Sequence, residues 1–511
     1  DEEDRHLDLF HVMMVNREFC KIAAPFLWNK FSGQPKQLIT YLSCLDQISR
    51  TYLKDCDIDL EPIPIGATFD YPSFLHKFNS RSLMDMCRSY TRLLEIPVAI
   101  EKLIPMFREL SKLFIGHNNH ILDLRIICYD PLMNPALDDM IAGLMLSEET
   151  NNFRNIKVFR WENLNHDSTL LFYEMSKSLR NLEEIEVFPD TICNGDAFAT
   201  FIRAQRNLRR ILISGEIYRE FDNLTPILEA LKSQENTLVC LELDKLILNP
   251  NDQRAKEGLM ACKKLKSLSL SMVHGLSKSI DFTTSFTLLE RFRYQHNLNP
   301  TSRGDMSHVS YELTISRILE TSGVNMRFVT LHEHSPLVIS TMIQHCHNVQ
   351  ELNINTCPLE NEEICNILAS LKKLRVFSFP YKENIDVNNL LLEMAQKLSS
   401  LTSSSLIAMK IFMPSGNPGK IIPDILQRFL EACRKSLVRY IWILNCPQHW
   451  DYLTERHLEV IKGSGVNFRL DLPYDNVVAQ FPGKLFVEIA YMLSLYMSLS
   501  EILTSIYDLN L

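Results

Sequence analysis

Residues 349–359 read VQELNINTCPL, and the spacing of their apolar side chains decides the fold. The positions of this pattern are Val349, Leu352, Ile354, Cys357 and Leu359. Leu352 and Ile354 lie two residues apart, so their side chains point to the same face of a short strand. The next apolar residues have the spacing of one helix face, at Ile364, Ile367, Leu368 and Leu371. The stretch therefore predicts a strand followed by an amphipathic helix.

The same strand pattern, L-x-x-L-x-L with other large apolar residues allowed, recurs along most of the chain. The twelve copies begin at Ile121, Ile156, Leu182, Leu208, Leu238, Leu265, Leu289, Met326, Val349, Leu374, Leu406 and Leu437. Their starts are about 29 residues apart on average, at the upper end of the range for leucine-rich repeats. A short strand and helix cannot bury their apolar faces alone, so successive copies must stack. The sequence therefore resembles a leucine-rich-repeat solenoid, an α/β fold with a curved parallel β-sheet on the concave face and helices on the convex face.

A doubly wound α/β domain also alternates strands and helices, and it is the alternative to this fold. Such a domain favours longer strands rich in valine and a glycine-rich phosphate loop after the first strand. The sequence has neither feature, and residues 416–421, which read GNPGKI, have the wrong spacing for a phosphate loop. The repeat is therefore the favoured interpretation.

The composition of the 511-residue chain excludes several classes of protein. With 46% hydrophobic and 23% charged residues, the chain is neither wholly disordered nor collagen-like. Its formal net charge of −9 provides no overall attraction to nucleic acid or to an anionic membrane. The 13 cysteines form no C-x-x-C pair, and the first residues show no secretory signal. Reduced thiols and a cytoplasmic or nuclear location are therefore expected.

One cluster of residues is of the type that binds metals or performs catalysis. It consists of His332, Glu333, His334, His345, Cys346 and His347. In a strand–helix repeat its two halves lie at opposite ends of the helix predicted over 337–344. Nothing in the spacing indicates a stabilised thiolate at Cys346, and histidines at a helix end commonly bond carbonyl groups. We therefore expect no metal, no cofactor and no catalytic residue, and an enzyme is the least favoured hypothesis.

Residues 7–31 read LDLFHVMMVNREFCKIAAPFLWNKF. This segment resembles the second half of an F-box, the helical module that docks adaptors onto Skp-type linker proteins, and its wording is similar to expanded F-box families of some fungi. The first half of the module is not in the chain. The resemblance implies that the docking residues are Val15, Arg17, Phe19, Pro25, Leu27 and Trp28. The alternative is a plain amphipathic helix that caps the repeats, with Trp28 in the core.

The strand residues that alternate with the buried ones are the candidates for binding a target protein. On the expected concave face they are Arg160, Glu184, Glu186, Arg210, Glu242, Arg291, Arg293, Glu351 and Asn353, together with Lys410 and Arg439. Charges of both signs are interleaved, which fits protein recognition better than a nucleic-acid groove with its uniform basic stripe. For any single residue the alternative is a solvated strand position. The polar loop over 295–308 is either a binding loop or solvated slack.

These observations predict four regions. They are a partial F-box-like segment over 1–31, a helical linker over 32–110, the repeats over 111–470 and a capping helix region over 471–511. The apolar residues 486–511 are interrupted by Glu488 and Glu501, so a closing amphipathic helix is favoured over a membrane span. The leading hypothesis is a non-catalytic substrate adaptor of a Skp–cullin–F-box type ubiquitin ligase. Its partners would be a Skp-type linker, a cullin scaffold and a target protein, without nucleic acid or membrane. The alternative is a repeat scaffold with no link to ubiquitin.

Overall fold

Strands and helices alternate along the chain, as the repeat pattern predicts, and the chain divides into two units. The computed structural model describes residues 9–470 outside short gaps and twelve longer ones. The longer gaps are 94–99, 129–154, 164–168, 190–194, 216–223, 247–251, 274–285, 296–308, 381–386, 401–404, 413–420 and 445–454. The predicted capping helix over 471–511 therefore lies outside the described residues, as does most of the loop over 295–308.

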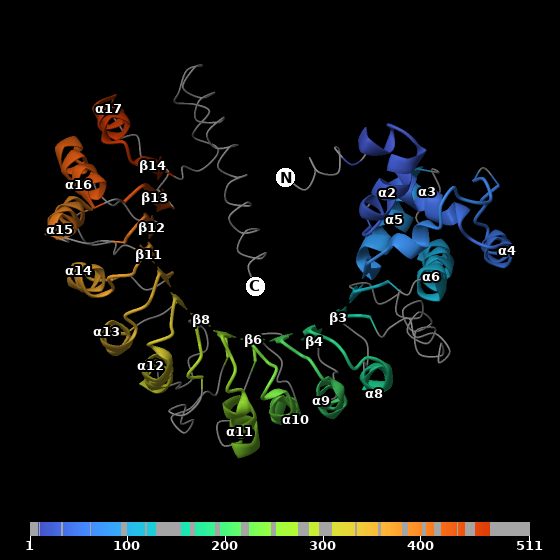
Figure 1. The fold of residues 1–511 in the computed structure, drawn as a ribbon, viewed down its shortest axis with the longest axis horizontal. Coiled ribbons are helices and arrows are strands. Elements are labelled where there is room, and N and C mark those ends of the chain that lie inside the picture. The colour runs from blue at the N-terminus through green and yellow to red at the C-terminus, as the bar shows by residue number, and fades with distance from the viewer. Residues whose placement is uncertain are drawn as a thin grey trace. The chain divides into compact units, whose positions relative to one another are not determined.

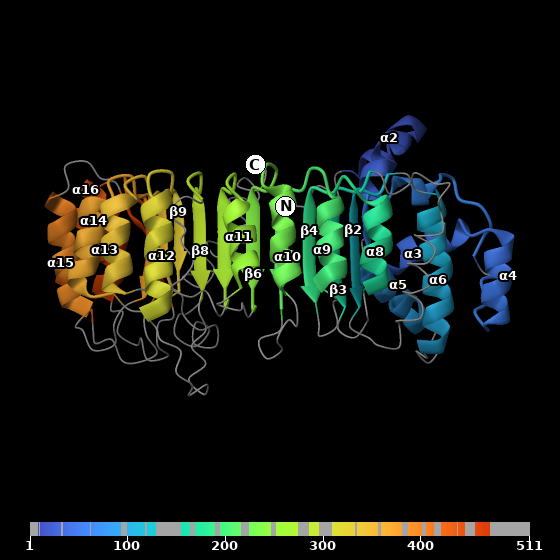
Figure 2. The ribbon, with the colours of Figure 1, turned by 90° about the horizontal axis from the view of Figure 1, so that it is seen from below.

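The N-terminal unit comprises Glu2–Leu265 with Met272–Gly275. Its strands pair in parallel and in chain order, and they are β1 (Lys77–Asn79), β2 (Asp123–Cys128), β3 (Val158–Asn163), β4 (Glu184–Pro189), β5 (Arg210–Ser214) and β6 (Cys240–Asp244). Ahead of β1 come α2 (Arg17–Leu27), α3 (Pro35–Ser43), α4 (Gln47–Asp55) and η1 (Tyr71–Phe74). After it come α5 (Ser80–Leu93), α6 (Ile100–His117), α8 (Thr169–Ser178), α9 (Gly195–Ala204), α10 (Leu224–Ala230), η4 (Leu231–Gln234) and α11 (Gln253–Ala261). Helices α8 to α11 lie side by side on one face of these strands (Figures 1 and 2).

The C-terminal unit comprises Lys266–Ser271 with Leu276–Leu511. Its strands are also parallel and in chain order: β7 (Ser267–Ser271), β8 (Arg291–Gln295), β9 (Phe328–Leu331), β10 (Glu351–Ile354), β11 (Val376–Pro380), β12 (Ala408–Phe412), β13 (Tyr440–Leu444) and β14 (Asn467–Leu470). Its helices are α12 (Val309–Ser322), α13 (Pro336–His345), α14 (Asn361–Ser370), α15 (Val387–Ser400), α16 (Pro423–Lys435) and α17 (Glu455–Ser464). The α/β class and the parallel sheet of the repeats are confirmed.

The repeated apolar positions form the core between strands and helices. In the N-terminal unit Ile185, Ile211 and Leu241 stand in register on three neighbouring strands, and none of them is exposed. Buried amides close the turns between copies. Gln205 donates from Nε2 to the carbonyls of Leu179 and Phe201 at 2.7 and 3.0 Å, which satisfies backbone groups that would otherwise be buried without partners.

The last of the twelve copies is shifted by one residue from its predicted register. The sequence pattern placed Tyr440 and Trp442 in the core, but Met409 of β12 pairs with Ile441, which is fully buried. Val438 and Ile441, both buried, are therefore core positions of this copy. A one-residue shift turns every side chain of a strand to the other face, so Tyr440 and Trp442 point away from the helices. Both frames match the apolar pattern, and the frame predicted from the sequence was the wrong one.

Two strands lie outside the twelve predicted copies. Strand β1 falls in the region predicted to be a helical linker, and Leu75, Phe78 and Ser80 occupy the three pattern positions because Phe78 pairs with Leu124 of β2. All three are buried. The pattern missed this copy because its third residue is polar. Ser80 Oγ donates to the carbonyl of Ile127 at 2.9 Å and accepts from its N–H at 2.8 Å. Strand β14 was missed because Gly465, with a φ of 69°, stands at the first position.

The strand residues that alternate with the core form what we call the open face of each unit. In the N-terminal unit the open face carries Asp123, Arg125, Arg160, Glu162, Glu184, Glu186, Arg210 and Glu242. In the C-terminal unit it carries Arg291, Arg293, Phe328, Glu351, Asn353, Ser378, Lys410, Tyr440 and Trp442. These side chains come from the strand positions between those that pack beneath the helices.

Candidate protein-interaction surfaces

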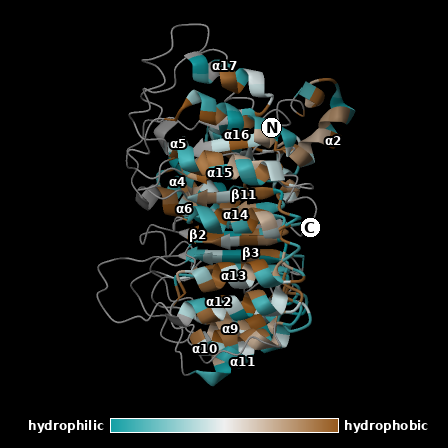
Figure 3. Ribbon diagram, turned by 90° about the vertical axis from the view of Figure 1, so that its left-hand side faces the viewer, coloured by the Kyte–Doolittle hydropathy of each residue, from teal (hydrophilic) through white to brown (hydrophobic). Residues whose placement is uncertain are grey.

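Helix α2 presents an apolar surface that none of the described residues of the unit covers. Asn16 caps the helix by accepting hydrogen bonds from the N–H groups of Glu18 and Phe19, both at 2.9 Å. Five large apolar residues of this segment are exposed, which are Met14 (73%), Val15 (66%), Phe19 (46%), Ile22 (62%) and Phe26 (59%). We call this set the α2 apolar face. Figure 2 shows α2 projecting beyond the layer of helices, and hydrophobic residues of the helix are brown in Figure 3.

The opposite side of α2 fixes the helix to the N-terminal unit. Ala23 and Ala24 are buried there. Trp28, the residue that ends the helix, packs against Tyr41 and Tyr71 with ring centroids 5.2 and 4.3 Å apart. The carbonyl of Asn29 then accepts hydrogen bonds from the N–H groups of His76 and Lys77 at 2.8 and 2.9 Å. This is the pairing that joins successive strands, so the end of α2 is anchored to the edge of the sheet.

The predicted docking residues are divided between these two sides. Val15, Arg17 and Phe19 are exposed, whereas Pro25, Leu27 and Trp28 are partly buried. Ile22 and Phe26 belong to the exposed side and were not predicted. The signal was available, because Phe19, Ile22 and Phe26 are three and four residues apart and so share one face of a helix. The docking role of these residues stays a prediction.

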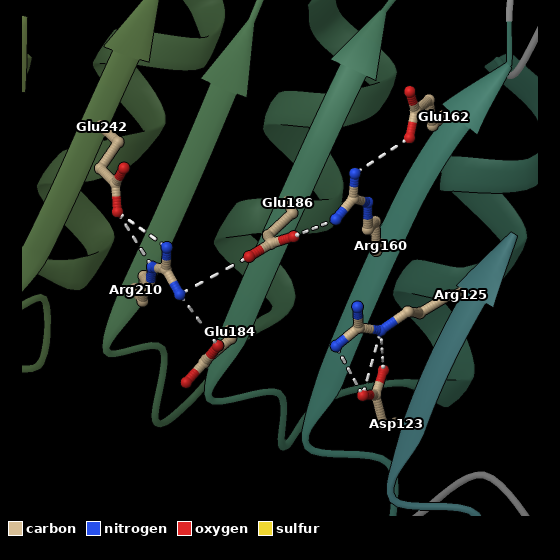
Figure 4. A network of polar contacts seen from close by, with 8 residues as sticks. All are labelled: Asp123, Arg125, Arg160, Glu162, Glu184, Glu186, Arg210 and Glu242. Carbon is tan, nitrogen blue, oxygen red and sulfur yellow. Dashed lines mark hydrogen bonds and ion pairs between the residues drawn. The ribbon is translucent and has the colours of Figure 1, made fainter. Parts of the chain in front are cut away.

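The open face of the N-terminal unit holds a network of ion pairs (Figure 4). Arg210 of β5 lies at its centre and bonds Glu242 of β6 from Nε and Nη2 at 3.1 and 2.9 Å. Its Nη1 lies 3.6 Å from a carboxylate oxygen of both Glu184 and Glu186 on β4. Arg160 of β3 extends the chain of contacts, 3.4 Å from Glu186 and 3.0 Å from Glu162. We call these residues the charge ladder; Asp123 and Arg125 form a separate pair beside it.

The guanidinium groups of this face are already paired with carboxylates. Three hydrogen bonds join Arg125 to Asp123, at 2.9 to 3.1 Å, and they raise the pKa of Arg125. Burial alone would lower the pKa of Arg210, but the attraction and hydrogen bonding of Glu242 raise it above its ordinary value. Each guanidinium therefore has a carboxylate partner, and a protein that covered this face would have to desolvate pairs that are already formed.

The open face of the C-terminal unit has a different character. Tyr440 and Trp442 stack with ring centroids 5.7 Å apart and planes 8° from parallel. The ammonium of Lys410 lies 5.4 Å from the centroid of the Trp442 ring. Arg291 of β8 stands 4.9 Å over the ring of Phe328. The aromatic pair was not predicted from the sequence, because the register predicted for the β13 copy was shifted by one residue.

The other predicted residues of this unit lie where the pattern put them, with one exception. Arg293 donates to Gln295 Oε1 at 3.3 Å, and Glu351 Oε1 accepts from Asn353 Nδ2 at 2.8 Å. Arg439 precedes β13 and is exposed, and the same one-residue shift removes it from the open face. Whether these residues bind a target stays a prediction.

The histidine and cysteine cluster shows no catalytic arrangement among the residues that the structure describes. Cys346 ends α13 as a fully buried side chain, and burial raises the pKa of its thiol to about 12, so the thiol is protonated at neutral pH. Glu333 and His334 lie outside the described residues. Within the described ranges no group of three or more His, Cys, Asp or Glu side chains is placed to hold a metal ion. No helix in those ranges is long and apolar enough to cross a membrane, and residues 486–511 are not among them.

Fold and surfaces together define a strand–helix repeat protein with an exposed apolar helix face and charged strand faces. No family model and no curated protein sequence matches the chain. Among solved structures, it is similar to a chain in the crystal structure of the Rad7 and Elc1 complex in yeast. The identity is 12% and the TM-score 0.36, over 76% of this chain and 92% of that chain. A likeness this distant does not bear on function, which has to be argued from the side chains.

Proposed function

We propose that this protein is a non-catalytic adaptor that holds a target protein for a Skp–cullin type ubiquitin ligase. The α2 apolar face would dock onto a Skp-type linker protein, and the open faces would bind the target. The observation that supports docking is the exposure of Phe19, Ile22 and Phe26 on one side of a helix whose other side is anchored. Exposed apolar residues gathered on one side of a helix indicate an interaction site, whereas single ones do not.

The amount of apolar surface is adequate for a helix-in-groove interface. Such interfaces place apolar residues at positions i, i+3, i+4 and i+7 of one helix into a groove of the partner. Phe19, Ile22 and Phe26 have this spacing, and Val15 precedes them in the turn. Burying a large apolar side chain contributes about 1.5–3 kcal/mol, so these four residues supply the apolar core of a stable contact. The resemblance of the segment's sequence to an F-box makes a Skp-type linker the proposed partner.

The experiment is a pull-down of the full chain with a purified Skp-type linker protein, repeated with a Phe19→Asp/Ile22→Asp variant. Both residues are exposed, so the variant should fold and lose the linker. Trp28 is not used, because its contacts with Tyr41 and Tyr71 hold the unit together. A Leu170→Asp variant is the matched control, since Leu170 is an exposed apolar residue (75%) on α8, outside the α2 apolar face.

The outcomes separate the adaptor from its alternative. Binding by the wild type and by the Leu170 variant, together with loss in the Phe19/Ile22 variant, would support the adaptor. A wild-type chain that does not bind the linker would refute the ubiquitin link and leave a plain interaction scaffold. Equal binding by wild type and Phe19/Ile22 variant would show that the linker docks elsewhere.

A further inference from the structure

The aromatic pair on β13 carries a cation that lacks an acidic partner. Lys410 and Trp442 pair directly in the register between β12 and β13, and the ammonium lies over the indole ring. Among the residues that the structure describes, no carboxylate forms an ion pair with Lys410. The ammonium of Lys410 is attracted to the face of the Trp442 ring, and Trp and Tyr are among the residues that contribute most to the binding energy of protein interfaces.

Ser378 provides a second and independent indication of a ligand. It stands between Asn353 and Lys410 in the same row across β10, β11 and β12. Only 2% of the residue is exposed, and its hydroxyl has no hydrogen-bond partner among the described residues. A buried hydroxyl without a partner destabilises a protein by about 1–3 kcal/mol, so such groups require an explanation. A ligand that accepts a hydrogen bond from this hydroxyl would remove the penalty.

Charge on this face selects the chemistry of the ligand. The described side chains of the open face of the C-terminal unit include Arg291, Arg293 and Lys410 against the single acid Glu351. A carboxylate of the ligand near Ser378 would contact both the Lys410 ammonium and the Ser378 hydroxyl. Glu351 does not compete for this place, because it lies two strands away from Lys410, about 10 Å at the usual strand spacing. The charge ladder of the N-terminal unit, in contrast, contains four carboxylates and two guanidinium groups, and each guanidinium group is already paired with carboxylates.

We propose that the open face of the C-terminal unit binds an extended protein segment in which an acidic side chain lies next to an aromatic residue or a proline. Lys410 and Ser378 contact the acid, and the Trp442 and Tyr440 rings receive its neighbour. Ser378, Lys410 and Trp442 lie on three adjacent strands and span about 10 Å, which two or three residues of an extended peptide cover. The inference rests on the proposed function, since it names the class of target that these faces take. A nucleic acid fits less well, because it calls for a continuous basic stripe.

The test is selection from a random peptide library displayed on phage, with the full wild-type chain as bait. A parallel selection uses the Lys410→Ala/Trp442→Ala variant, after its circular dichroism has been matched to wild type. Sequences enriched only on wild type should combine Asp or Glu with Trp, Tyr, Phe or Pro. A synthetic peptide of that sequence should bind at least about tenfold more weakly to Lys410→Ala and to Trp442→Ala in fluorescence anisotropy. Lys435→Ala, an exposed lysine of α16, should bind as wild type does.

Ser378→Ala separates binding from packing. This variant should raise the urea midpoint, because it deletes the hydroxyl that has no partner, and yet weaken peptide binding several-fold. The inference is overturned if no acidic peptide is enriched over the double variant, if Lys410→Ala binds as tightly as wild type, or if a single-stranded oligonucleotide displaces the peptide stoichiometrically. The Phe19→Asp/Ile22→Asp variant should retain peptide binding. Linker binding without peptide binding would therefore refute this inference alone, and the reverse would refute only the docking.

Discussion

Arg210 holds the charge ladder together, and its replacement by Met should destabilise the N-terminal unit by about 2.5 kcal/mol. Met keeps the apolar stem and deletes the guanidinium, so the loss is mainly electrostatic. The two N–H···O bonds to Glu242 are charge-assisted and contribute about 1.5 kcal/mol. The longer contacts to Glu184 and Glu186 contribute about 0.5 kcal/mol each, because the Arg210 side chain is 35% exposed and solvent screens it.

Urea unfolding followed by far-UV circular dichroism measures this loss, and a cycle of Arg210→Met, Glu242→Gln and the double variant isolates the pair. Coupling between Arg210 and Glu242 should be about 1.5 kcal/mol and should shrink in 1 M salt. Arg203→Met is the control, since Arg203 is exposed on α9 and should change stability by less than about 0.5 kcal/mol. An Arg210→Met variant that unfolds at the wild-type urea midpoint, or a coupling near zero, would refute the claim that the ladder is a stabilising network.

Three further perturbations test a close helix contact, a buried hydrogen bond and a partly buried histidine. Gly258→Ala should lower the free energy of unfolding in urea by about 3 kcal/mol, because an added Cβ would collide with the backbone of Leu228. Gly463→Ala is the control and should leave stability unchanged, because its added Cβ would meet no atom of another described element within 4 Å. Equal effects of the two substitutions would contradict the close approach of the helices at Gly258. Ser80→Ala should lower the free energy of unfolding by about 1–2 kcal/mol, because it leaves the N–H and the carbonyl of Ile127 in β2 without their hydrogen-bond partner. An unchanged urea midpoint would count against those two bonds. Burial, the larger cause, and the charge of Arg293, the smaller one, lower the pKa of His332 below its unfolded value of about 6.5. The unfolded chain therefore takes up the proton more readily, and stability that is full above about pH 6.5 declines as the pH falls below it. A His332→Gln variant should lose less stability than wild type between pH 7.5 and 5.5, and an equal loss would show that another group titrates.

The repeat could be predicted because the core of each copy is local. Eleven copies gave the correct strand register from three apolar residues each, and the spacing of the copies gave the parallel sheet. The misses have physical causes. Ser80 and Gly465 fill apolar positions through hydrogen bonds and a positive φ, which no apolar pattern detects. At β13 two frames match the pattern equally, and only the burial of Ile441 against the neighbouring copy decides between them.

The candidate surfaces were less predictable because they depend on distant residues. The identities of the ladder residues follow from strand alternation, but their pairing follows from the register between strands that are about 30 residues apart. Trp28 was predicted from its own segment to be a docking residue, and this role stays a prediction. Its ring packs against Tyr41 and Tyr71, which no local pattern connects to it. Ile22 and Phe26 were within reach of sequence reasoning, since their helical spacing from Phe19 was visible.

The number of charges on a face is a poor guide to where a partner binds. The ladder of the N-terminal unit contains four carboxylates within reach of two guanidinium groups, yet its side chains already satisfy one another across four strands. A partner would have to remove water from formed pairs and gain little in return, so the ladder is better understood as a device that fixes strand register. The face around Lys410 has fewer charges, but within the described part of the chain its ammonium has no carboxylate partner and the Ser378 hydroxyl has no hydrogen-bond partner. Binding energy comes from interactions that are still to be made, and we therefore propose the C-terminal unit as the part of the chain that binds the target.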